Sequence, residues 1–401
     1  MSRKERNFFI ILAIQGLAFN FAHPVTPTLI KSLNLNSYMF GIAFASMALT
    51  SFLFSQFWGY MSNKRNEGFI FMICCILYSF SQFMFLKSVS ELDIIIARSI
   101  GGCFIAGINV SSLNYIVRIS PKESRAQNIT LFASITAITA AFGYLIGGFA
   151  GNSDIKYSFY LQIITLIAAG VAFNIIGIKR DTCPKIRCRE MINQSNPAFF
   201  LSKNISISKS LVFTLTLALI STIAATAYDQ TFNYYIKDIF DFKPSSNGLI
   251  KSIIGAITMA VNSTICIYIE KKGIIRKSLI YIFLGCAVNL ILAILFDNVV
   301  LFMLFNFIFV AFNALHVPLI QAMLTTSKDN SFNVLGFYNT MKSLGWIIGG
   351  VVAGITYSFY YKLPFIIAII CFFIIFAISL PYRNEEGPKS YKKAGSPSYK
   401  G

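Results

Sequence analysis

Apolar stretches of about 20 residues recur along the whole chain, separated by short polar segments. A helix needs about 20 apolar residues to cross the hydrocarbon core of a bilayer. The pattern therefore predicts an all-α membrane protein with twelve transmembrane helices. Their expected ranges are 8–30, 38–60, 69–87, 93–117, 128–150, 157–178, 210–236, 246–268, 278–296, 299–325, 333–358 and 363–381.

The longest polar interruption within this pattern runs from Lys179 to Lys209 and divides the helices six and six. We therefore expect a six-helix bundle over residues 1–178 and a second one over residues 210–382. The segment 179–209 is expected to be a cytoplasmic central loop. The polar tail, 383–401, is expected to be disordered and cytoplasmic.

Composition supports a membrane protein and excludes other classes. Of the 401 residues, 56% are hydrophobic and 12% are charged, whereas soluble domains have about 25% charged residues. A soluble globule of this size could not bury so much apolar surface. Disorder of the whole chain is excluded because its hydrophobicity is high.

The net charge of +18 reflects membrane orientation and does not indicate a nucleic-acid partner. With the N-terminus inside, the twelve-helix arrangement places 25 Lys and Arg residues in inner segments and 6 in outer ones. Such an excess is typical of cytoplasmic loops. We expect a multi-pass protein of the cytoplasmic membrane, with both termini in the cytoplasm.

Two segments of the first half recur in the second. Gly59-Tyr-Met-Ser-Asn63 aligns with Cys266-Ile-Tyr-Ile-Glu270 at an offset of 207, and the Gly-rich motifs of the fifth and eleventh helices align at an offset of 202. Six helices per repeat give both halves the same direction across the membrane. This parallel repeat is typical of secondary transporters, whose substrate site lies near the midplane between the halves. The residues expected to serve conformational change are Gly59, Asn63, Lys64, Glu270, Gly273, Gly143, Gly147, Gly148, Gly345 and Gly349.

These motifs resemble those of the major facilitator superfamily, and most closely those of bacterial drug–proton antiporters. The segment after the second helix resembles G-x-x-x-D-R-x-G-R-R, with Asn63 in place of the acid. Arg98-Ser-Ile-Gly-Gly102 matches R-x-x-x-G, and Gly143-Tyr-Leu-Ile-Gly-Gly148 resembles G-P-x-x-G-G. The resemblance implies the major facilitator fold, in which the first, fourth, seventh and tenth helices line a central cavity.

Ionisable side chains inside a membrane are costly and therefore mark candidate functional sites. Asp229 is the only acidic residue well inside a predicted helix. His23 precedes it by 206 positions, close to the repeat offset, so both should lie at similar depth. A carboxylate facing a cavity can take up and release protons, which a proton-coupled carrier requires. The alternatives are a solvated Asp229 near a helix end and a His23 that serves packing.

The surroundings of Asp229 extend the resemblance. Ala227–Tyr235 resembles the seventh helix of the efflux pumps, where an acid occupies the matching position. Those pumps have a second acid where Asn313 stands and an arginine where His316 stands. The expected proton-coupling residues are Asp229, His23, Arg98 and His316, with no direct contact between His316 and Asp229. For Arg98, a structural role bonded to backbone carbonyls is the alternative.

Polar side chains in the predicted helices are candidates for lining a substrate path, although many such groups only join helices by hydrogen bonds. The candidates are Asn20, Asn109, Tyr228, Gln230, Asn233 and Asn313.

The sequence favours a secondary active transporter. It contains no Gly-Lys dipeptide and therefore no nucleotide-binding P-loop of the G-x-x-x-x-G-K-[ST] type. We expect proton-coupled export of a small drug-like or endogenous molecule such as a metallophore, working as a monomer without metal or cofactor. Proton-coupled uptake is the alternative. An integral membrane enzyme would need a clustered catalytic set, which the sequence does not show, so we expect no enzyme.

Overall fold

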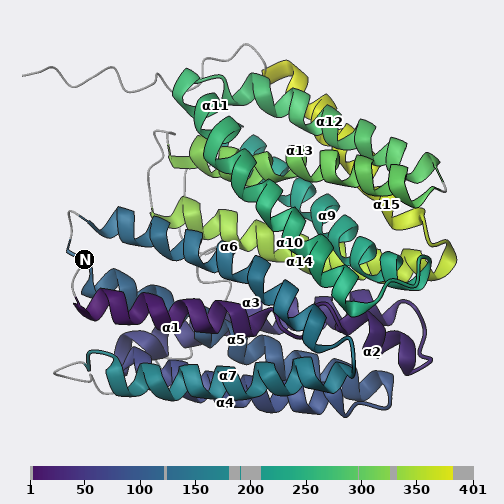
Figure 1. The fold of residues 1–401 in the computed structure, drawn as a ribbon. Helices are drawn as coiled ribbons and strands as arrows, with labels where there is room; N and C mark the ends of the chain where they lie inside the picture. Colours follow the sequence, from purple (N-terminus) through teal and green to yellow (C-terminus); the bar gives the residue numbers. More distant parts are fainter. Residues whose placement is uncertain are drawn as a thin grey trace, which may run out of the picture.

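The computed structural model describes residues 3–121, 124–179, 190, 209–296, 298–325 and 332–382. These residues form long helices that lie side by side (Figure 1). The first half contains α1 (Arg3–Phe19), α2 (Thr26–Ser32), α3 (Met39–Lys64), α4 (Glu67–Leu86), α5 (Glu91–Ile119), α6 (Arg125–Ala150) and α7 (Ile155–Ile176). The second half contains α9 (Lys209–Asp238), α10 (Pro244–Val261), η2 (Asn262–Cys266), α11 (Ile267–Lys272), α12 (Ile275–Leu295), α13 (Val299–Thr325), α14 (Phe332–Phe359), α15 (Leu363–Ser379) and η3 (Leu380–Tyr382).

The predicted all-α membrane fold is confirmed. Within the described residues, ten helices are long and apolar enough to cross a bilayer, with α10, η2 and α11 counted as one. The two remaining spans of the predicted twelve are α14 and the pair α1 and α2. The observed ends lie within a few residues of the predicted ones, apart from the first span. The expected domain limits at the central loop and the tail remain predictions, because those segments fall almost entirely outside the described residues.

The first span is broken rather than continuous. Between α1 and α2, residues 20–25 form turns around Pro24, whose ring prevents a regular helix from continuing. The carbonyl of Pro24 accepts a hydrogen bond from Asn247 Nδ2 of α10 at 3.0 Å. A polar group from the other half thus satisfies backbone that the break exposes, as the interior of a membrane protein requires.

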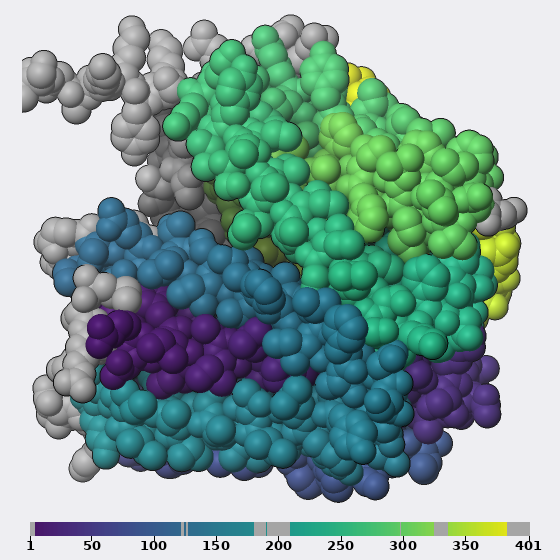
Figure 2. Space-filling model, in the orientation of Figure 1, coloured from purple at the N-terminus to yellow at the C-terminus, as the bar shows by residue number. Residues whose placement is uncertain are grey.

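The two halves share a core at one end of the bundle only. We call the end where α1 begins the α1 end, and the end that carries α2 the α2 end. One hydrophobic cluster spans both halves and includes Leu29, Phe40 and Phe232. A second cluster, which includes Phe8 and Tyr115, is confined to the first half. Figure 2 shows the two halves in contact toward the α2 end and diverging toward the α1 end.

Glycines bring the helices of the two halves into close contact at the α2 end. A Cβ on Gly41 of α3 would lie 2.3 Å from the Gly350 carbonyl of α14. A Cβ on Gly148 of α6 would lie 2.6 Å from the Pro244 carbonyl of α10. Because such distances are sterically impossible for a side chain, only glycine permits these two crossings.

A buried ion pair fixes the α1 end of the first half. Arg118 at the end of α5 donates two hydrogen bonds of 2.9 Å to the carboxylate of Glu67, which begins α4 and is fully buried. Arg118 also donates to the carbonyl of Ile178 at 2.8 Å. The pair therefore joins α4, α5 and the end of α7.

We expect Glu67→Gln to lower the free energy of unfolding by about 1.5 kcal/mol, because Arg118, whose side chain is 28% exposed, loses its charged partner and keeps only a weaker bond to the amide. Thermal unfolding of the purified protein in detergent measures the change. The matched control is Asp154→Asn, which removes an exposed ion pair with Lys156 and should change stability by less than about 0.5 kcal/mol. Equal effects of the two substitutions would contradict a structural role for Glu67.

Candidate functional site

Asp229 pairs with a lysine that the sequence analysis did not assign. Lys251 Nζ of α10 lies 2.6 Å from Asp229 Oδ1 of α9. The lysine is buried, with 7% of its side chain exposed, whereas 54% of the Asp229 side chain is exposed. Gln230 Nε2 donates to the other carboxylate oxygen at 3.5 Å. The carboxylate is thus held on one side by a buried cation and is open on the other.

Groups from the first half also reach this ion pair. His23, in the break between α1 and α2, lies within electrostatic range of Asp229, Lys251 and Arg98. Its ring centroid is 5.6 Å from that of Tyr144 of α6, which is also within range of Asp229. The sequence predicted only a similar depth for His23 and Asp229; the structure brings them within electrostatic range of each other. Asp229 thus lies at the boundary between the two halves.

A depth comparison could have found Lys251. Asp229 lies eight residues before Lys237 at the end of α9, and Lys251 lies eight residues after Lys243, just before α10. Because both helices meet the same end of the bundle, the acid and the lysine are at the same depth. Lys251 lies inside a predicted helix, so it belongs to neither the inner nor the outer segments, and it was not among the predicted partners of Asp229.

Arg98 lies within the first half, apart from the ion pair. Its guanidinium stacks 3.8 Å from the ring centroid of Phe85 and donates to Thr26 Oγ1 at 3.4 Å. It is only 7% exposed, and no carboxylate of the described residues lies within ion-pair distance. Its contacts are thus with a ring and a hydroxyl, not with the backbone carbonyls considered from the sequence.

His316 occupies a separate place in the second half. It is 1% exposed, and its Nδ1 lies 2.5 Å from the Asn313 carbonyl one helical turn earlier in α13. Its Nε2 and the side-chain oxygen of Asn313 are buried without a partner among the described residues. Lys342 of α14 is within electrostatic range of His316. No contact joins His316 to Asp229 in the described residues, as expected.

The predicted substrate-lining residues divide into three groups. Gln230 and Asn233 are partly exposed and lie on α9 close to Asp229, while Asn313 is partly exposed on α13. Tyr228 is buried and donates to Asn306 Oδ1 at 2.9 Å, so it joins α9 to α13. Asn20 donates to the Gly16 carbonyl within its own chain segment, and Asn109 is exposed on α5. Gln230 and Asn233 are therefore the candidates nearest the ion pair.

The glycine motifs act partly within each half and partly between the halves. Gly143 and Gly147 of α6 pack on residues 17–21, and Gly345 and Gly349 of α14 pack on α9. Of the selected glycines, Gly148 contacts the other half. The remaining glycine contacts between the halves are made by residues outside the selected set, including Gly41, Gly248, Gly350 and Gly354.

The motif residues near the α1 end have mainly local roles. Gly273 ends α11 with a positive φ of 67°, a conformation that favours glycine. Lys64 pairs with Glu190 at 3.7 Å, and Glu270 accepts a weak bond from Cys266. Gly59 packs loosely, with Val110 4.0 Å from its Cβ position, and Asn63 lies in the last turn of α3.

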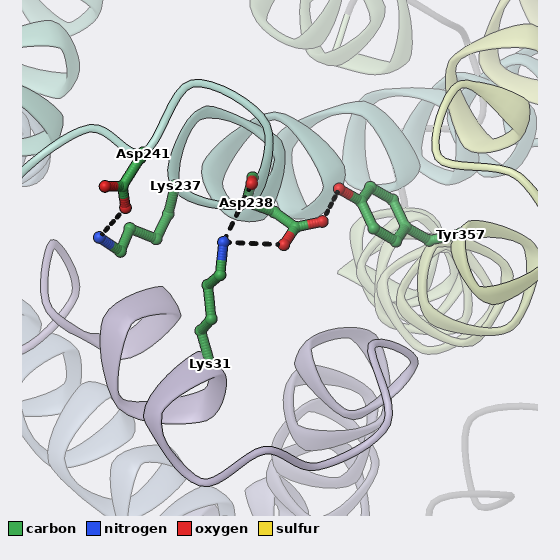
Figure 3. Close-up of polar contacts among 5 residues, drawn as sticks. All are labelled: Lys31, Lys237, Asp238, Asp241 and Tyr357. Atoms are coloured by element: carbon green, nitrogen blue, oxygen red, sulfur yellow. Dashed lines mark hydrogen bonds and ion pairs between the residues drawn. The ribbon is translucent and has the colours of Figure 1, made fainter.

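A polar latch closes the α2 end (Figure 3). Lys31 Nζ, from α2, lies 3.2 Å from Asp238 Oδ1 and 3.0 Å from the Asp238 carbonyl at the end of α9. Tyr357 of α14 donates its hydroxyl to Asp238 Oδ2 at 2.9 Å. Asp238 thus joins the first half to two helices of the second.

A neighbouring pair orders the loop beside the latch. Lys237 Nζ lies 2.6 Å from Asp241 Oδ1. This hydrogen bond lowers the pKa of the Asp241 carboxyl below its ordinary value. The carboxylate therefore stays ionised at neutral pH, and the pair is lost only when the pH falls through that lowered pKa.

We expect Lys31→Met to open the α2 end in a larger share of molecules. The ion pair is partly exposed, with side-chain exposures of 40% and 28%, so it is worth at most about 1 kcal/mol, or roughly a fivefold change in the ratio of closed to open molecules. Electron–electron distance measurements between spin labels at Val89→Cys and Lys243→Cys, two exposed positions on different halves at the α2 end, report this ratio in a background without native cysteines. An unchanged distance distribution would show that Lys31 does not hold the halves together.

The Asp229–Lys251 ion pair lies at the boundary between the two halves, which we call the seam, close to His23 and Tyr144 of the first half. The half-exposed carboxylate of Asp229 on α9 is paired with the buried ammonium of Lys251 on α10. The described residues contain no group of three or more His, Cys, Asp and Glu side chains that could hold a metal ion.

The chain is similar in sequence to two bacterial drug-resistance proteins over most of its length. Quinolone resistance protein NorA of Staphylococcus aureus strain MSSA476 is 24% identical over 368 residues, covering 90% of this chain and 91% of that protein. Multidrug resistance protein 2 of Bacillus subtilis strain 168 is 21% identical over 372 residues, covering 91% and 92%.

Solved structures and a family profile complete the comparison. A bacterial homologue of the iron transporter ferroportin superposes with a TM-score of 0.72 at 11% identity, covering 96% of this chain and 100% of that one. The human organic anion transporter MFSD10 superposes with a TM-score of 0.67 at 15% identity, covering 94% and 100%. Residues 8–330 match the sequence profile of the Major Facilitator Superfamily. The chain therefore belongs to the Major Facilitator Superfamily of membrane transporters.

Proposed function

We propose that the protein exports a small organic molecule in exchange for protons, with Asp229 as the proton-carrying group. The observation that carries this proposal is the Asp229–Lys251 pair at the seam, in which a buried lysine holds a half-exposed carboxylate at 2.6 Å. Protonation of Asp229 removes the negative charge from the pair and leaves Lys251 as an uncompensated buried cation. The two protonation states therefore favour different arrangements of the helices around the seam.

The contacts between the halves support alternating access around this seam. The glycine contacts between α3 and α14 and between α6 and α10, and the ion pair of Lys31 with Asp238, all lie toward the α2 end. With the termini in the cytoplasm, as the charge distribution indicates, this end faces outward. The described state is then closed to the outside, and Asp229 is reached from the cytoplasmic side. Both halves and the seam belong to one chain, so a monomer suffices.

The similar proteins support the direction and the substrate class. Two relatives that align over about 90% of the chain are named for resistance to quinolones and to multiple drugs. Export of drug-like molecules is the transport that such resistance implies. The proposal also includes an endogenous product of similar size, because the few polar groups near Asp229 do not select one particular substrate.

Proteoliposomes with an acidic lumen test the function, with a fluorescent quinolone as the probe. Transporter molecules whose α1 end faces the outside of the liposome should accumulate the quinolone in the lumen. A protonophore should abolish this accumulation. Empty liposomes correct for passive entry of the probe. Accumulation only with an acidic exterior would identify proton-coupled uptake, and accumulation insensitive to the pH gradient would refute proton coupling.

A further inference from the structure

The helices carry more positive than negative charge in their central parts. Within the described helices, four charged side chains lie at least seven residues from either end of their span: Arg98, Asp229, Lys251 and Lys342. Asp229 is the single acid, and it is paired with Lys251. Arg98 and Lys342 are therefore left without a carboxylate among the described residues. Each uncompensated charge inside a membrane protein needs a partner or water.

Arg98 already has partners that seal it from any ligand. Its guanidinium lies over Phe85, contacts Met47 Sδ at 4.0 Å and donates to Thr26. With 7% of its surface exposed, it has no open side toward the seam. Lys342 is therefore the cation that remains available.

Lys342 has aromatic neighbours and an accessible side. Its Nζ lies 5.5 Å from the ring centroid of Tyr338 and 5.4 Å from that of Trp346. Lys342 is partly exposed and Trp346 is 42% exposed. Ring faces stabilise a cation only in part, so a negatively charged group would still gain from binding the ammonium.

The position of Lys342 on α14 directs it toward the space between the halves. Successive residues of a helix are rotated by about 100° around its axis. Viewed along the axis of α14, Lys342 points between the directions of Gly349, which packs on α9, and Gly350, which packs on α3 of the first half. Gly345 and Gly349 of α14 pack on Thr222 and Thr226 of α9, so Lys342 is level with Leu219 of α9. Asp229 lies ten residues further along α9. Lys342 is therefore about 15 Å nearer the α1 end than Asp229 is.

Unsatisfied polar atoms lie beside this lysine. His316 is within electrostatic range of Lys342, and its Nε2 is buried without a partner among the described residues. Because a carbonyl can only accept, the contact with Asn313 places a hydrogen on Nδ1. In the neutral ring Nε2 therefore carries the lone pair and can only accept a hydrogen bond, so it does not bind an anion itself. The ammonium of Lys342 is the group of this cluster that can hold a negative charge.

We propose that the transported molecule is an organic anion whose carboxylate or phosphate group binds Lys342, with its apolar or aromatic body against Trp346. This inference rests on the transport function proposed above. The anion and the proton bind at different depths, so their exchange rests on each favouring a different arrangement of the helices rather than on direct displacement. Export of an anion in exchange for a proton moves positive charge inward, and the membrane potential therefore drives it together with the pH gradient.

Fluorescence of Trp346 tests the site without any gradient. The chain has only two tryptophans, so Trp58→Phe leaves Trp346 as the sole reporter. The probes are 3,5-diiodobenzoate and 3,5-diiodobenzamide, which share a quenching ring and differ in charge. We expect the carboxylate to quench Trp346 saturably at a concentration about tenfold or more below the amide, since a charge-assisted contact is worth about 1.5–3 kcal/mol.

Variants of Lys342 separate charge from packing. Lys342→Met should remove the preference for the carboxylate, Lys342→Arg should keep it, and the surface control Lys156→Met should leave it unchanged. Equal binding of the two probes by the protein with Lys342 intact would overturn the proposal. A preference for the carboxylate that survives Lys342→Met would also overturn it. Because no proton gradient is used, a failure of proton coupling in proteoliposomes leaves this result intact, and the two proposals fail separately.

Discussion

Replacing Asp229 by asparagine is expected to abolish proton-driven accumulation of substrate in proteoliposomes. The amide keeps the size of the side chain and can still accept a hydrogen bond from Lys251, which lies 2.6 Å from the carboxylate. It cannot take up or release a proton. We therefore expect accumulation at the level of empty liposomes under a pH gradient, while substrate binding in detergent persists.

Two further variants make this result specific. Asp229→Glu keeps a titratable group and should retain part of the driven transport. Asp238→Asn removes the acid of the latch, which is partly exposed and paired with Lys31, and should reduce transport by no more than a few fold. Full proton-driven accumulation by Asp229→Asn would remove Asp229 from the mechanism and leave the membership of the family untouched.

The second large effect is expected from tying the α2 end shut. Asn152, between α6 and α7, and Ser245 of α10 come from different halves, and their side-chain oxygens are 3.0 Å apart. A short bifunctional methanethiosulfonate reagent should join Asn152→Cys and Ser245→Cys in a background without native cysteines. Because alternating access requires this end to open, transport should fall to background and return after reduction.

The single-cysteine proteins, treated with the same reagent, provide the control and should transport normally. Substrate binding from the α1 end should survive the cross-link, since that end is not joined. If the cross-linked protein transports at the untreated rate, the contacts at the α2 end do not form a gate.

Hydrophobic pattern predicted most of the fold because long apolar runs determine which segments enter a bilayer. The tenth helix matches its predicted range, 299–325, and most others begin or end within three residues of it. The first span failed as one helix because a count of apolar residues does not register the break at residues 20–25. Pro24 was the available signal, although proline often only bends a helix.

The site was predicted less completely, because single residues within apolar runs carry no pattern. Asp229 and His23 were selected as ionisable residues inside predicted helices, their repeat offset predicted a similar depth, and the structure brings them into electrostatic range. Lys251 was missed although it is an ionisable residue inside the predicted helix 246–268, which by itself marks a candidate site. Its depth relative to Asp229 was a second signal.

The latch shows information that the repeat contained and the sequence analysis did not use. Lys31 and Asp238 are 207 positions apart, the same offset as the loop motifs. Residues at matching positions of two repeats meet where they lie close to the pseudo-twofold axis. The offset could therefore have paired this lysine with this aspartate. Glu67 had no such signal, since it begins its helix as an ordinary terminal acid and is buried only through tertiary packing.

The central claim is that the protonation state of Asp229 controls which end of the seam is closed. The distance distribution between spin labels at positions 89 and 243, measured as a function of pH without substrate, tests it most directly. The account predicts that the wild-type distribution shifts between short and long distances as the pH changes, and that Asp229→Asn gives one distribution at every pH. A pH-dependent shift of the same size in Asp229→Asn would contradict it.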